Sequence, residues 1–131
     1  MDDRTRERLT VLRNGLLEHH RRLLDSERAA YDRDVARITN PGQYFNLVLS
    51  DPWFAWLREL SQFIVLIDEA LASKEPSAGP DGDRLIAEAR QLLSPSENGS
   101  GFRHSYFEAM QRDPAVVLAH RDMMQVFAGL G

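Results

Sequence analysis

The most continuous apolar pattern of the chain lies between Asp51 and Ala72. Pro52 suits the first turn of a helix, where its missing N–H is not needed, and Asp51 precedes it as an N-cap. Apolar residues then recur at spacings of three and four, which is the helical period. They are Trp53, Leu57, Leu60, Ile64, Ile67 and Leu71. Further apolar residues widen this face, so we expect a central helix that other helices cover on most sides.

Helical spacing also predicts a long first helix over residues 3–37. The Asn-Pro-Gly sequence at 40–42 is a turn signal, and a short apolar helix should occupy residues 43–50. Asp51-Pro52 should interrupt the helix there, because proline removes a hydrogen-bond donor and clashes with the preceding turn.

The second half of the chain predicts two more helices. A polar loop over residues 73–83 precedes a brief helix over 83–93, and a second loop fills 94–101. The last helix should run over 102–129, with a second interruption at Asp113-Pro114. No segment shows the alternation of a strand. Short connections favour antiparallel neighbours, so we expect a single domain (1–131) that is all-α, an up-down four-helix bundle.

Two polar residues fall on the apolar face of the first helix. At about 100° per residue, His20 and Glu27 lie at the centre of that face, whereas His19 points away and should be solvated. His120 shares the apolar face of the last helix. In an up-down bundle, His20 and His120 reach nearly the same height, because each residue adds about 1.5 Å.

The same rise of about 1.5 Å per residue places other polar residues of different helices at equal heights in the bundle. Asp68 falls level with Arg13, so we expect a salt bridge between them. Glu27 falls level with both Asp-Pro interruptions and near Trp53 and Arg112. Interrupted helices expose N–H groups, and a carboxylate at that height is a natural acceptor.

Two interpretations of this polar layer remain open. The first is a structural network, since buried polar groups are normally hydrogen-bonded whether or not they serve chemistry. The second is a small-ligand or metal site built from His20, Glu27 and His120, with Trp53 beside them, because bundle cores do hold such sites. An enzyme acting at that layer is the least favoured hypothesis.

Composition excludes several function classes. The formal net charge is −4, and the first 37 residues hold nine Arg and eight acids, so no basic surface for nucleic acid is indicated. The chain has no Cys, no Glu-x-x-His pair and no glycine-rich phosphate loop. We therefore expect no cofactor. The apolar segment carries too many charges to cross a membrane, and the N-terminus lacks an apolar signal core, so a cytoplasmic location is expected.

The lengths of the expected helices favour self-association. The helix over 83–93 is too short to cover the whole first helix, so a second chain or the short helix around Phe45 must cover the remainder. Phe45, Phe54 and Trp56 are the candidate interface residues, since aromatic side chains anchor interfaces. We expect a non-enzymatic protein–protein interaction module, with a homodimer as the simplest form.

Three segments together resemble a known family. They are residues 23–31, residues 51–69 with their Asp-Pro-Trp-Phe-Ala-Trp start, and residues 102–120. These segments are similar to a family of small bacterial all-helical proteins to which no activity is assigned. The resemblance covers most of the chain. It implies a helical fold in a bacterial cell, and it implies no site residues.

Overall fold

The computed structural model describes residues 1–73 and 82–131. All regular structure in these two ranges is helical, which confirms the all-α class. The elements are α1 (Asp3–Asp34), α2 (Pro41–Ser50), the 3-10 segment η1 (Pro52–Leu57), α3 (Arg58–Ala72), α4 (Gly82–Leu92), α5 (Gly101–Arg112) and α6 (Pro114–Leu130). Most of the loop predicted over 73–83 lies outside the described residues.

The same capping sequence, an Asn or Asp followed by Pro, begins three of these elements. Asn40, Asp51 and Asp113 are each N-caps followed by proline, and the side chain of each accepts a hydrogen bond from a backbone N–H of the first turn. The cap stabilises the start of a helix, while proline keeps the preceding residue extended. The interruptions predicted at residues 51–52 and 113–114 are therefore confirmed.

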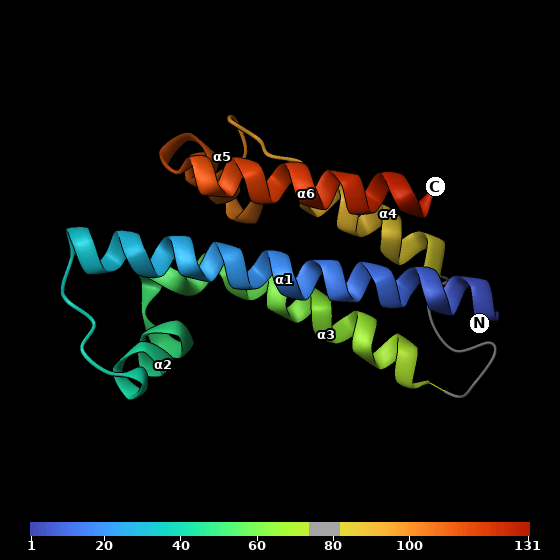
Figure 1. Cartoon of the computed structure of the whole chain (residues 1–131), viewed down its shortest axis with the longest axis horizontal. Helices are drawn as coiled ribbons and strands as arrows, with labels where there is room; N and C mark the ends of the chain where they lie inside the picture. Colours follow the sequence, from blue (N-terminus) through green and yellow to red (C-terminus); the bar gives the residue numbers. More distant parts are fainter. Residues whose placement is uncertain (74–81) are drawn as a thin grey trace.

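The interruption at Asp113-Pro114 also changes the direction of the chain, which the sequence did not indicate. Tyr106 Oη lies 2.7 Å from His120 Nδ1, whereas 14 residues of continuous helix would separate them by about 21 Å. The backbone of Asp113 is extended (φ −132°, ψ 114°), so α6 leaves the line of α5 while the two helices remain in contact. The expected single broken last helix of a four-helix bundle is therefore replaced by two separate helices, α5 and α6, that lie across one another (Figure 1).

Figure 1 shows how the elements surround α1. This helix spans the length of the molecule, with α3 on one side and α4, α5 and α6 on the other. Two contacts along each helix pair fix the directions. Glu27 and Arg13 of α1 meet Trp53 at the start of η1 and Asp68 of α3. Arg22 and Arg8 of α1 meet Asp122 and Leu130 of α6. Both α3 and α6 therefore run antiparallel to α1.

The central position belongs to α1 rather than to the predicted central helix. Leu9, Leu12 and Leu16 of α1 are fully buried. In α3, by contrast, Val65 and Leu66 are about half exposed. The expectation that residues 51–72 are covered on most sides is wrong, because α3 lies at the edge and packs mainly on α1. No helix in the described part of the chain is both long and apolar enough to cross a membrane.

Candidate functional site

Glu27 is the centre of a polar cluster that joins α1 to the end of α5 and the start of α6. It is only 3% exposed, and its carboxylate forms an ion pair with Arg112 at the end of α5. Trp53 Nε1 donates to the Glu27 backbone carbonyl at 3.3 Å, and Ser26 Oγ donates to Asp113 Oδ2 at 2.7 Å. Burial raises the pKa of Glu27, and the Arg112 charge opposes that rise. The ion pair thus compensates for burying a carboxylate.

A second cluster links the same three helices through one hydroxyl group. Tyr106 Oη of α5 lies 2.9 Å from His19 Nε2 of α1 and 2.7 Å from His120 Nδ1 of α6. The two ring nitrogens are therefore at most about 5.6 Å apart, the sum of these two distances. A tyrosine hydroxyl has one proton, so it donates to one imidazole and accepts from the other. Burial, followed by the nearby His120, lowers the pKa of His19 to about 4.

The placement of the two adjacent histidines is a correction to the sequence expectation. His19, expected in solvent, is 2% exposed, whereas His20, expected in the core, is only partly buried. Buried residues of α1 alternate at spacings of three and four from Leu9 to Ala30, which is a seven-residue repeat. At about 100° per residue, His19 lies about 20° from Leu12, whereas His20 lies beyond Leu9 at the other edge of this face. The face that carries Leu12 and Leu23 therefore buries His19.

His20 belongs to a different seam of α1. It lies seven residues from Arg13, which pairs with Asp68 of α3, and seven from Glu27, whose carbonyl binds Trp53. This spacing places His20 on the side of α1 that faces η1 and α3. Partial burial lowers its pKa. The structure therefore brings His120 to His19 and Tyr106, and it brings Glu27 to Trp53 and Arg112, but it does not gather His20, Glu27 and His120.

The salt bridge expected between Arg13 and Asp68 is present, with Arg13 Nε as the donor. Both side chains are about two-fifths exposed. Solvent screens a pair of this kind, so it fixes the register of α1 against α3 more than it stabilises the fold.

A shallow pocket borders the Glu27 cluster. It has a volume of about 190 Å³, and Trp53, Trp56, Ser105 and Glu108 line it with Glu27 and Arg112. Most ligand pockets are larger, at about 300–1,000 Å³. The Glu27 carboxylate is already paired with Arg112. Within residues 1–73 and 82–131, no three His, Asp or Glu side chains are grouped as metal ligands. The positions of these residues thus give no support to a metal or ligand site at this layer.

The three candidate interface residues have three different environments. Phe54 is 1% exposed and packs between Tyr31 and Tyr44. It is a core residue, and its assignment to an interface is wrong, because α2 covers it. Trp56 is partly buried, with its ring centroid 5.3 Å from that of Phe102. Phe45 is 63% exposed.

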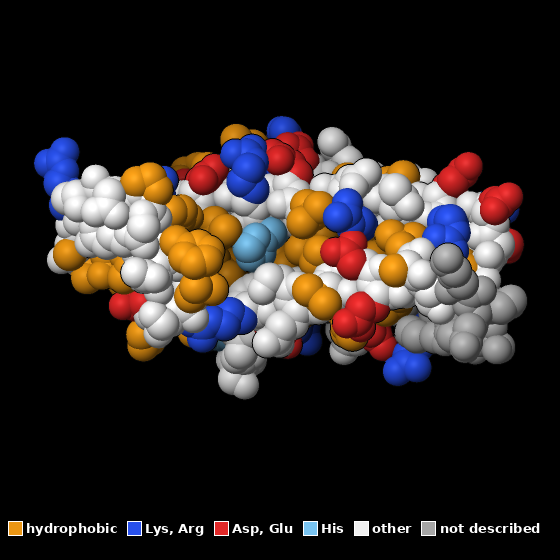
Figure 2. Space-filling view, turned by 90° about the horizontal axis from the view of Figure 1, so that it is seen from below, with side chains coloured by type: hydrophobic (Ala, Val, Ile, Leu, Met, Phe, Trp, Pro, Cys, Tyr) orange, Lys and Arg blue, Asp and Glu red, His pale blue; other side chains and the backbone are white. Residues whose placement is uncertain are grey.

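Phe45 belongs to the least covered helix of the molecule. No residue of α2 is buried, and Leu49, one turn after Phe45, is 57% exposed. The inner side of α2 packs through Tyr44, whose ring meets Phe54 on one side and the Arg28 guanidinium at 4.5 Å. Figure 2 shows hydrophobic side chains gathered at the end of the molecule that holds α2. We call Phe45 and Leu49 the α2 face.

Comparisons with protein-family models, curated proteins and solved structures found no match to this chain. Tyr106 is the site residue that the sequence reading missed. The signal that could have found it was its hydroxyl group, since a buried tyrosine usually needs a hydrogen-bond partner.

Proposed function

We propose that the protein is a non-enzymatic interaction module that self-associates through the α2 face. One observation carries the proposal: α2 presents Phe45 and Leu49 to solvent without burying any residue of its own. A helix is usually held in a small protein by burying an apolar face. The side of α2 that carries Phe45 and Leu49 is instead exposed, so it is available to pack against another protein surface.

The rest of the molecule supports an interaction role over chemistry. Among the described residues, every buried side-chain N or O atom has a hydrogen-bond partner. A catalytic or ligand site normally keeps some polar groups available for its substrate. The polar clusters around Glu27 and Tyr106 are instead closed by Arg112 and by two histidines.

A second copy is the partner that this surface fits. The α2 face consists of an exposed aromatic and an exposed aliphatic side chain one helical turn apart. In an isologous dimer, the same patch meets itself, so Phe45 and Leu49 of one copy would pack against those of the other. Aromatic and aliphatic side chains at its centre would supply the buried anchor.

Light scattering coupled to size-exclusion chromatography tests this proposal. The wild-type chain should elute as a concentration-dependent dimer, and Phe45→Ser with Leu49→Ser should shift the mass to the monomer. A matched control is Val117→Ser with Leu118→Ser, which removes a similarly exposed apolar pair from α6. The proposal fails if the wild type is monomeric at millimolar concentration, or if the control pair dissociates the dimer equally.

A further inference from the structure

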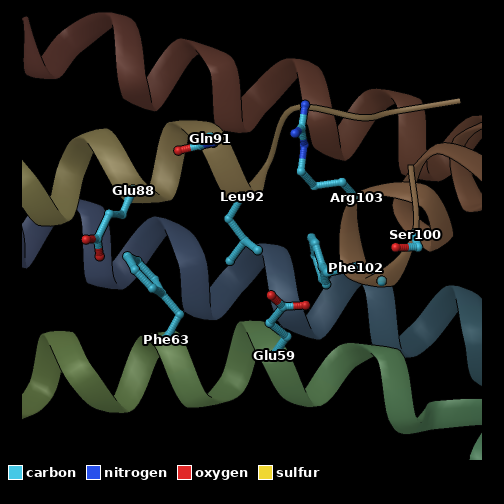
Figure 3. Close-up of a pocket in the computed structure, with 9 residues that line it drawn as sticks. Glu59, Phe63, Glu88, Gln91, Leu92, Ser100, Phe102 and Arg103 are labelled. Atoms are coloured by element: carbon cyan, nitrogen blue, oxygen red, sulfur yellow. The ribbon is translucent and has the colours of Figure 1, made fainter. Parts of the chain in front are cut away.

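A cavity lined in part by aromatic rings lies between α3, α4 and the start of α5, and its lining includes no residue of α2. Its volume is about 350 Å³, within the range of small-ligand sites. Phe63, Leu92 and Phe102 form its apolar wall. Figure 3 shows these three side chains directed into the space between the helices, with the ribbon of α1 behind them.

Two carboxylates stand at opposite ends of that apolar wall. Figure 3 places Glu88 of α4 beside Phe63 and Glu59 of α3 beside Phe102, with Leu92 between them. Glu88 Oε1 accepts a hydrogen bond from the exposed Arg84 at 3.0 Å, which leaves its second oxygen available. No ion pair with another described residue engages Glu59. The cavity thus offers two negative ends joined by an apolar strip.

Arg103, the basic residue that lines the cavity, does not neutralise the negative charge of Glu59 and Glu88. Arg103 Nε donates to the Ser94 carbonyl at 2.8 Å, and its side chain points away from Phe63 and Leu92. Ser100, which precedes α5, lies on the far side of Phe102 from Glu88 in Figure 3. The positive end of the α5 dipole, which favours anions, therefore lies outside the strip between the two carboxylates.

We propose that this cavity binds an aliphatic polyamine, with its methylene chain on Phe63 and Leu92 and an ammonium group at each of Glu59 and Glu88. Methylene groups lose contact with water against the rings, and ammonium groups are attracted both to carboxylates and to aromatic faces. A monoamine satisfies one end only, and an anion is repelled from both. This site is independent of the α2 face.

Titration calorimetry with cadaverine tests the assignment on the full-length chain. Wild-type protein should bind cadaverine, whereas pentanediol, which has the same length without charge, should not bind. Glu59→Gln and Glu88→Gln should each weaken binding by about threefold, as expected for partly exposed ion pairs, and the double variant by about tenfold. Arg84→Gln should strengthen binding, because it frees Glu88.

A matched control distinguishes a built site from general attraction to an acidic protein. Glu69→Gln removes an exposed carboxylate of α3 that does not line the cavity. It changes the net charge by the same amount as Glu59→Gln and should leave the affinity unchanged. Equal weakening by both variants overturns the proposal, as does absence of cadaverine binding.

A lysine side chain of another protein also carries an ammonium group on a methylene chain, so it resembles one half of a polyamine. N-acetyl-lysine amide distinguishes a protein lysine from a polyamine as the ligand, because it carries only one ammonium group. It should bind more weakly than cadaverine and should be insensitive to one of the two Glu→Gln changes. Binding as tight as that of cadaverine would overturn the polyamine assignment in favour of a protein lysine.

Discussion

η1 contacts two regions of opposite character. One is the packed assembly of α1, α5 and α6, where Glu27, Arg112 and Tyr106 close polar clusters between helices. The other is α2, which has no buried residue and leaves Phe45 and Leu49 in solvent. Buried polar groups specify one arrangement, since each must find its partner. An apolar surface without such partners is free to meet another surface.

The largest expected difference between these regions is in their response to pH. The pKa of His19 falls from 6.5 to about 4 on folding, chiefly through burial. Between these values the unfolded chain binds the extra proton, so stability is full above pH 6.5 and falls as the pH drops toward 4. The loss from His19 alone is about 3 kcal/mol. Urea unfolding at a series of pH values measures it.

The control for this prediction is His19→Gln, which keeps a polar group near Tyr106 but cannot be protonated. The slope of stability against pH between 6.5 and 4 should become shallower, with the remaining slope due to His20 and His120, whose pKa values burial also lowers. An unchanged slope would show that His19 does not carry the effect. The α2 face holds no histidine, so Phe45→Ser should leave the slope as it is.

The next largest effect should come from breaking the ion pair of Glu27. Arg112→Met leaves a carboxylate that is 3% exposed without its cation. Loss of one partner from a buried pair costs about 3–5 kcal/mol, and we expect about 2 kcal/mol here because the Arg112 side chain is 37% exposed. Thermal or urea unfolding at neutral pH should detect this destabilisation.

Arg121→Met is the matched control for this substitution. Arg121 is an exposed α6 arginine paired with Asp122 at 3.0 Å, and its loss should change stability by no more than about 0.5 kcal/mol. Because removing the Arg112 charge raises the pKa of Glu27 further, the stability deficit of the Arg112→Met variant relative to the wild type should shrink as the pH falls toward 5. Equal losses in the two variants would mean that burial of Glu27 is not costly.

The smallest effect on stability should come from the α2 face itself. Phe45→Ser should alter the unfolding free energy of the monomer by no more than about 0.5 kcal/mol, because the side chain is 63% exposed. Unfolding at low micromolar concentration isolates this monomer value. A loss above 2 kcal/mol would mean that Phe45 belongs to the core, and the contrast between the two regions would then disappear.

Much of the local structure could be predicted from the sequence. The N-caps before Pro41, Pro52 and Pro114 mark helix starts because capping and the fixed φ of proline act over a few residues. The Arg13–Asp68 pair followed from counting residues along antiparallel helices. His19 was also within reach, since a strict alternation of three and four from Leu9 identifies it as a buried position.

Other features depend on contacts between distant segments. A break at Asp113-Pro114 is local, but its direction is decided by Tyr106 meeting His120 and by Arg112 meeting Glu27. Phe45 is exposed and Phe54 is buried, and this difference likewise depends on the position at which α2 packs against the rest of the molecule. Two apolar aromatics nine residues apart have the same local preference, and only packing distinguishes them.

The sequence by itself determined an all-helical chain, the helix starts and the heptad face of α1, because hydrogen-bond capping and apolar periodicity act within one or two turns. The tertiary structure decided that α6 leaves the line of α5 and packs against it, that His19 rather than His20 shares the Tyr106 hydroxyl, and that the Phe45 and Leu49 side of α2 remains exposed. These outcomes require partners far apart in the chain, and their energies exist only when the helices have docked.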